Sequence, residues 1–123
     1  MSGLEIEGLI TFLYYGDLER AMRFYEDILR LEKTVDQGWA KIYRVADAAH
    51  VGLVDGERGY HRPSPEKPVM ITILVSDVDS WYAHFVDRGV KTLGAPRDNP
   101  DLRIRAFLLE DPEGYVIEIQ RFL

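Results

Sequence analysis

The sequence contains no cysteine, only three histidines, and no long apolar run. Without cysteine the chain has no disulfide and no thiolate ligand for a metal. No window approaches the roughly 18 apolar residues of a membrane-spanning helix, so we expect no contact with a membrane. The acidic start MSGLEIEG lacks the basic and apolar regions of a signal peptide, and a cytoplasmic location is therefore expected.

Positive charge is also scarce. Acidic residues outnumber basic ones by 21 to 15, which gives a formal net charge of −6. Because phosphate backbones bind basic surfaces, we expect no nucleic-acid partner. The apolar content of 46% and the charged content of 29% are those of a globular protein, and 123 residues suit a single domain with an ordinary core.

The chain repeats itself at an offset of 60 residues, and no gap is needed. The segment ITFLYYGDLERAMRFYEDIL, from Ile10, aligns with MITILVSDVDSWYAHFVDRG, from Met70. In each copy an alternating apolar stretch leads to an aspartate, Asp17 or Asp77, at the position of a helix N-cap. The apolar stripe that follows has the spacing of one buried helical face. Its members are Leu18, Ala21, Met22 and Tyr25 in the first copy, and Val78, Trp81, Tyr82 and Phe85 in the second.

Three strand-like pieces follow each predicted helix. They are EKTVDQ, WAKIYRV and HVGLV in the first half, and KTLG, RIRAFLLE and YVIEIQRF in the second. Each half therefore predicts a β-α-β-β-β module, at about residues 8–55 and 68–122, in a single α+β domain over 1–123. The aperiodic segment 55–68 is predicted as a linker and not a domain boundary, because one such module alone buries too little surface. The stretch DPEG before the last piece predicts a type I turn.

Two modules of this kind resemble the vicinal oxygen chelate superfamily, which includes glyoxalase I, extradiol dioxygenases, fosfomycin-resistance proteins and bleomycin-binding proteins. The resemblance rests on YYGDLERAMRFYEDIL, VSDVDSWYAHFVDRGV and the closing DPEGYVIEI. It implies a cupped, mostly antiparallel sheet with helices outside and a ligand cavity inside, and a homodimer. Metal-dependent members carry one ligand on the first and one on the last strand of each module. By position, these sites fall on Ile10, Met70, about Gly52, and Glu118.

This set of residues predicts no metal and no cofactor. Isoleucine and glycine have no side-chain donor, and Met70 offers only a thioether, whereas divalent ions prefer imidazole or carboxylate ligands. His50 is predicted to share a strand face with Gly52. A poor site made of His50, Glu118 and water molecules therefore stays open as an alternative.

Glu118 stands between two isoleucines on the last predicted strand. Alternation along a strand sends Ile117 and Ile119 to the helix side and Glu118 into the cup. Three interpretations of Glu118 are open. It is a half-buried strand residue with a local partner, an acid that contacts a ligand or acts as a general base, or a metal ligand.

The inward faces predict a mostly apolar pocket with a few polar groups, which is typical of a small-molecule site. The alternative is that these side chains meet and fill a core. Tyr43 shares a strand face with Trp39 and Lys41, and it would supply an aromatic wall or cover the core. With Glu118 as the candidate catalytic residue, the candidate ligand-binding residues are Phe12, Tyr14, Tyr43, His50, Met70 and Thr72.

The leading functional hypothesis is metal-free binding or sequestration of a small, partly apolar ligand, by analogy with the bleomycin-binding relatives. The net acidity suits a cationic ligand. The alternative is an enzyme related to glyoxalases or dioxygenases, a lyase or isomerase, that uses Glu118 with or without a metal. A third hypothesis is a collapsed cup that serves only for dimerisation.

One residue departs from the family pattern at the end of the first helix. Arg30, in ILRLE, stands where the family usually has glycine, whereas the second copy keeps Gly89 in DRGV. Glycine suits the left-handed conformation that ends many helices. Arg30 therefore adopts that conformation at some cost, or the chain leaves the helix differently.

Overall fold

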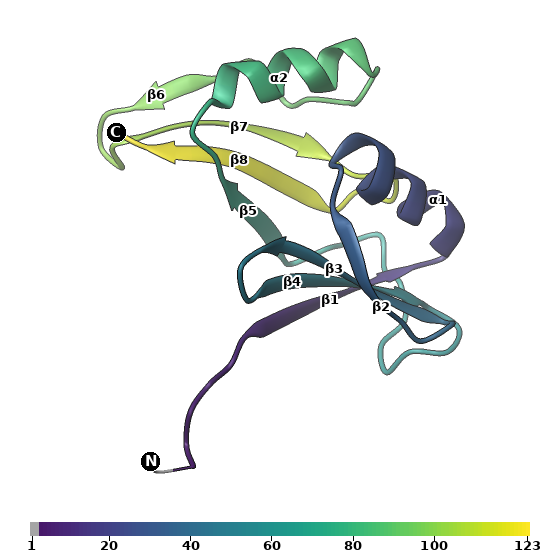
Figure 1. The fold of residues 1–123 in the computed structure, drawn as a ribbon. Helices are drawn as coiled ribbons and strands as arrows, with labels where there is room; N and C mark the ends of the chain where they lie inside the picture. The colour runs from purple at the N-terminus through teal and green to yellow at the C-terminus, as the bar shows by residue number, and fades with distance from the viewer. Residues whose placement is uncertain (1–2) are drawn as a thin grey trace. The chain divides into compact units, whose positions relative to one another are not determined.

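The computed structural model describes residues 3–123 and divides the chain into two compact units (Figure 1). The first unit ends at Pro63, and the second runs from Ser64 to Leu123. The division lies inside the segment predicted as a linker. Each unit has one four-stranded mixed sheet and one helical segment, so the α+β fold class is confirmed. None of the helices within 3–123 is long and apolar enough to cross a membrane.

The first unit contains the three strands predicted after its helix. Its elements are β1 (Leu9–Tyr15), α1 (Leu18–Arg23), the π-helical turn η1 (Phe24–Ile28), β2 (Glu32–Asp36), β3 (Ala40–Ala46) and β4 (Ala49–Asp55). The sheet order is β1-β4-β3-β2, in which β1 and β4 are parallel and the other neighbours are antiparallel. The first and last strands of the module are thus adjacent, at one side of the sheet.

The second unit repeats this topology. Its elements are β5 (Met70–Leu74), α2 (Val78–Asp87), β6 (Arg97–Asn99), β7 (Ile104–Glu110) and β8 (Val116–Phe122). The order β5-β8-β7-β6, with β5 and β8 parallel, matches the first sheet strand for strand. The predicted turn before β8 is also confirmed, because the Gly114 N–H donates to the Asp111 carbonyl at 3.1 Å.

The piece KTLG is not the strand that was predicted. Thr92 makes a single bridge to Leu109, and the chain then passes through Gly94, at φ 120°, before it pairs again as β6. A glycine in that conformation interrupts the strand, and a proline follows two residues later. The edge strand is therefore displaced toward the C-terminus of this segment.

Both helices begin at the predicted aspartates. The Asp17 carboxylate accepts a hydrogen bond from the Arg20 N–H at 3.1 Å, and Asp77 accepts one from the Ser80 N–H at 3.0 Å. The caps satisfy backbone donors that have no partner inside the helix. In the stripe that follows, Tyr25 and Phe85 are buried at equivalent positions.

The first helix contains one residue more than the second. The Leu29 N–H donates to the Phe24 carbonyl, five residues back, at 3.1 Å, which is the π-helical bond of η1. Arg30 then has φ 61°, and in the second unit Gly89 has φ 71°. The repeat offset thus changes from 60 to 59 within the helix, and Arg30 does adopt the left-handed conformation.

Exchanging these two helix ends tests the cost of that conformation. We expect Arg30→Gly to raise the free energy of unfolding by about 0.5–1 kcal/mol. A residue with a side chain pays about 1–2 kcal/mol to adopt the left-handed conformation, and glycine avoids this cost. Part of the gain is offset because glycine loses more conformational entropy on folding. Gly89→Arg should lower it by a similar amount. Urea denaturation measures both, and an Arg30→Gly protein no more stable than the parent would contradict the account.

Candidate functional site

Each sheet has one face covered by its helix and one open face. In the second unit Ile117 and Ile119 are fully buried on the helix side. Glu118, between them, points to the open face, as predicted from the alternation. Met70 and Leu74, from the neighbouring strand, are 50% and 59% exposed on that face.

Glu118 has a local partner on the open face. The Thr72 hydroxyl donates to Glu118 Oε1 at 2.9 Å, between residues that pair directly across β5 and β8. This bond agrees with the interpretation of Glu118 as a strand residue with a local partner. The same carboxylate retains a second oxygen that can accept a further hydrogen bond.

The first unit has Phe12 and Gly52 at the positions equivalent to Thr72 and Glu118. Phe12 pairs with Gly52 across β1 and β4, as Thr72 pairs with Glu118, so the assignment of Gly52 as the counterpart of Glu118 is confirmed. A Cβ on residue 52 would approach the Phe12 ring to 2.4 Å. The Phe12 ring therefore occupies the space that a side chain at position 52 would need.

Tyr14 and His50 lie on the same open face of the first unit. The segment 56–62 folds over part of this face, where the His61 ring meets the Tyr14 ring edge to face at 5.3 Å. Backbone hydrogen bonds hold that segment: the Gly56 N–H donates to the Tyr15 carbonyl, and the Arg58 and Gly59 N–H groups donate to the Asp55 carbonyl. His50 pairs with Ile10, and its Nδ1 is buried without a hydrogen-bond partner.

The prediction that Tyr43 lines the pocket is wrong. Tyr43 is fully buried on the helix side of the first sheet, and its hydroxyl donates to Glu26 Oε2 at 2.5 Å. Burial and then the Glu26 carboxylate raise the pKa of Tyr43 above its ordinary value. Alternation predicted that Tyr43, Lys41 and Trp39 share a face, and only the tertiary structure decided which face that is.

The resemblance assigns four positions to metal ligands, and in this chain they are Ile10, Gly52, Met70 and Glu118. In the first unit, Ile10 has no donor and Gly52 lies against the Phe12 ring. In the second unit, Met70 stands beside a single carboxylate that already accepts a bond from Thr72. Within residues 3–123, no group of three or more histidine, aspartate and glutamate side chains is suited to hold a metal ion.

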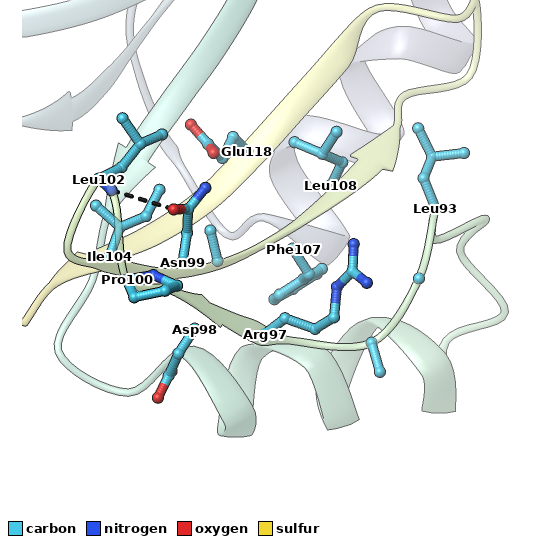
Figure 2. Close-up of a pocket in the computed structure, with 13 residues that line it drawn as sticks. Leu93, Arg97, Asp98, Asn99, Pro100, Leu102, Ile104, Phe107, Leu108 and Glu118 are labelled. Carbon is cyan, nitrogen blue, oxygen red and sulfur yellow. Dashed lines mark hydrogen bonds between the residues drawn. The ribbon is translucent and has the colours of Figure 1, made fainter.

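A cavity of about 790 Å³ lies in the second unit, where the edge strand leaves its partner. From Thr92 to Arg97 the edge takes five residue steps, while β7 takes three, from Leu109 to Ala106. The extra residues form an outward arc that opens space above β7. Figure 2 shows Leu93 on this arc, with Leu108 and Glu118 on the neighbouring strands.

The cavity has apolar walls and charged residues of both signs. Leu93, Leu102, Ile104 and Leu108 supply apolar surface, and Arg97, Asp98 and Glu118 are the charged residues of the lining. Of these, Asp98 accepts a hydrogen bond from Arg105. Arg97 pairs with Ala106, which pairs with Gln120, so Arg97 projects from the same face as Glu118. Sequence reasoning missed Arg97, because APRDNP reads as a loop rich in turn residues and shows no strand alternation.

A second arginine holds the edge strand in place. Arg105, on the helix side of β7, donates to both Asp79 oxygens at 2.9 and 2.7 Å, and to Asp98 at 3.0 Å. These bonds connect α2 to β6 through one guanidinium. Asp98 consequently points toward the helix, and its neighbour Arg97 points the other way (Figure 2).

A sequence model of the Glyoxalase/Bleomycin resistance protein/Dioxygenase superfamily matches residues 9–119, from the start of β1 into β8. The chain belongs to this superfamily. The uncharacterised protein YraH of Bacillus subtilis is 25% identical, with 90% of this chain and 94% of YraH covered. Membership explains the repeated module, and it leaves the reaction or ligand to be argued from the site.

Two solved structures share the fold of this chain. A superfamily member from Sphaerobacter thermophilus matches with a TM-score of 0.81 at 20% identity, covering 96% of this chain and 98% of that one. A lactoylglutathione lyase from Agrobacterium tumefaciens matches with a TM-score of 0.75 at 20% identity, covering 98% of this chain and 96% of that one. At this identity the likeness shows the fold alone.

The Arg105 bridge should be sensitive to acid. Hydrogen bonds from Arg105 hold the pKa of Asp79 below its ordinary value of 3.8. Because the pKa is lowered in the folded state, this stabilisation is present above pH 3.8 and is lost as the pH falls below that value, through the folded-state pKa. In Arg105→Met, we expect the pKa of Asp79 to rise to its ordinary value, as measured by NMR titration of its carboxyl carbon.

Arg121→Met is the matched control for this titration, because it removes the same charge from the position that pairs with Arg105. In that variant the pKa of Asp79 should stay low. An unchanged titration of Asp79 in Arg105→Met would show that the bridge does not hold this carboxylate in solution.

Proposed function

We propose that the protein binds a small, partly apolar organic molecule in the cavity over β6, β7 and β8, and that it does so without the metal of its metal-dependent relatives. The observation that carries this proposal is the cavity itself. Its volume of about 790 Å³ lies in the range of small-molecule sites, and it combines apolar walls with Glu118 and Arg97. The side chains at the metal positions support the metal-free part, since three of the four offer no nitrogen or oxygen donor.

The bleomycin-resistance branch of the superfamily supplies the analogy for binding without chemistry. In this chain, the open face of the second unit exposes Met70 and Leu74 beside the Thr72–Glu118 pair. An apolar molecule placed there would remove these side chains from water, which favours binding by roughly 25 cal/mol per Å² buried. Thr72 would orient Glu118 through its hydrogen bond, and Met70 would contact the apolar part of the bound molecule.

Filling the cavity tests this proposal. Ala106 is half-buried on the open face, next to Arg97, and it lines the cavity. A panel of neutral, acidic and basic aromatic compounds should contain ligands that shift the backbone amide signals of β7 and β8. At about a hundred times its Kd, such a ligand should stabilise the fold by about 2.7 kcal/mol. Ala106→Phe should abolish both effects.

Ala83→Phe is the matched control, because it adds the same ring at an exposed position of α2. This variant should bind as the parent does. Leu93→Ser, which removes one exposed apolar wall residue, should weaken binding without threatening the core. If no compound in the panel perturbs the β7 and β8 amides of the parent, the cavity is not a ligand site.

An enzyme is the second candidate function, and the position of Glu118 favours it. The carboxylate lines the cavity, and its Oε2 is available to take a proton from a bound molecule. The chemistry would be a proton transfer, of the isomerase or lyase class. Glu118→Gln should then retain ligand binding and lose turnover, since the amide keeps the shape but is not a base.

Metal analysis separates the metal-free proposal from a metalloenzyme. The protein, purified without chelators, should contain transition metal far below one equivalent per chain. Stoichiometric nickel, zinc, iron or manganese in the parent, lost in Glu118→Ala, would overturn the metal-free proposal. Glu113→Ala, on the turn before β8, is the control for a general loss of negative charge.

A further inference from the structure

Arg97, on β6, and Arg105, on the neighbouring strand β7, project from opposite faces of the second sheet and differ in their partners. Arg105 donates to two carboxylates, Asp79 and Asp98, on the helix side. Arg97 lies on the open face, and within the described residues 3–123 no carboxylate forms an ion pair with it. The sequence neighbour that would neutralise it, Asp98, is turned toward Arg105. The guanidinium of Arg97 thus faces the cavity with its donors available.

The surroundings of Arg97 restrict what its partner can be. Leu93 and Leu102 are 46% and 65% exposed at the cavity wall, so a partner must bring apolar surface as well as negative charge. Glu118 lies two strands away and two residues further along its strand, because Arg97 is in line with Ala106 and Gln120. With a strand spacing of about 4.8 Å and a rise of about 3.4 Å per residue, the backbone separation is roughly 12 Å. The side chains of Arg97 and Glu118 both project over Ala106 and Leu108. One small molecule can therefore contact the guanidinium and the carboxylate together.

The presence of Glu118 selects among anions. A phosphate with two negative charges would be repelled by the Glu118 carboxylate, whereas a carboxylic acid with an adjacent hydrogen-bond donor offers each group a matched partner. Guanidinium binds carboxylate through two parallel hydrogen bonds, and the free oxygen of Glu118 accepts from a hydroxyl or ammonium group.

We infer that Arg97 is a ligand-binding residue and that the cavity takes a small acid with an apolar body: an α-hydroxy or α-amino acid whose carboxylate pairs with Arg97 and whose hydroxyl or ammonium group donates to Glu118. This inference rests on the proposed function and names its ligand class. It replaces the cationic ligand that the net charge favoured, because the local arrangement of two opposite charges outweighs a diffuse excess of −6.

Four related compounds test the ligand class. Phenyllactate and phenylalanine carry the acid and the donor, whereas 2-phenylethylamine and 2-phenylethanol lack the acid. By NMR titration of the parent, we expect the two acids to bind at least tenfold more tightly than the two compounds without the carboxylate. The comparison of phenyllactate with phenylalanine then decides whether Glu118 receives a hydroxyl or an ammonium group.

Substitution of Arg97 tests the residue. Arg97→Gln should weaken binding of the acids by roughly tenfold to a hundredfold, the usual effect of removing a charged hydrogen-bond donor, and leave the two compounds without an acid unaffected. Arg97→Lys should restore part of the affinity, because the charge returns without the planar fork. Arg121→Gln, which removes the same charge from the opposite face, should bind as the parent does.

The outcomes separate this inference from the proposed function. If the amine or alcohol binds in the cavity as tightly as the acids, or if Arg97→Gln and Arg121→Gln bind the acids equally, the inference is wrong while the cavity remains a ligand site. If inorganic phosphate competes with phenyllactate at similar concentration, the anion is not selected by Glu118, and the assignment to carboxylic acids fails. If none of the four compounds binds but another compound of the aromatic panel does, the inference is wrong and the proposed function stands. If no compound of either set binds in the cavity that Ala106→Phe fills, both proposals are wrong.

Discussion

Side-chain alternation along β8 is the constraint on which the rest of the second unit depends. Successive residues of a strand point to opposite faces, so the burial of Ile117 and Ile119 under the helix leaves Glu118 no choice of side. A shift of one residue in the pairing with β5 would expose both isoleucines and bury the carboxylate, a cost of several kcal/mol in hydrophobic burial alone. The apolar core thus positions the acid.

The same constraint acts in the first unit, with a different result on the open face. There β4 buries Val51 and Leu53 on the helix side, and Gly52 occupies the position of Glu118. The Phe12 ring fills the space over Gly52. A repeated fold therefore carries two unlike faces, one aromatic and one with a hydrogen-bonded carboxylate. Because the core needs only alternation, the open-face residues of the two copies are free to diverge.

The cavity depends on a local failure of strand pairing. Gly94 and the residues around it leave β7 between two points of contact, and Arg105 fixes the strand again beyond the arc by binding Asp98 and Asp79. Arg105 thereby holds Asp98, the acidic side chain of β6, on the helix side. Within residues 3–123, no carboxylate forms an ion pair with Arg97 on the open face, and the proposal of a ligand with its own negative charge rests on this.

From the sequence alone, the repeat at 60 residues, the two aspartate caps, the turn before β8 and the direction of Glu118 could all be predicted. These features depend on residues close together in the chain, through capping, turn chemistry and period-two alternation. They sufficed for the α+β fold, and the resemblance to the family that their order suggested agrees with the family match over residues 9–119.

Only the tertiary structure decided which face of β3 the helix covers, and for this reason Tyr43 was misplaced. Glu118 was placed correctly because the isoleucines on either side of it mark the buried face of β8. It also decided where the edge strand of the second unit pairs, and hence the cavity and the role of Arg97. Both depend on partners distant in the chain. Alternation defines two faces but does not say which is inside, and a short edge strand has too few residues to show a period.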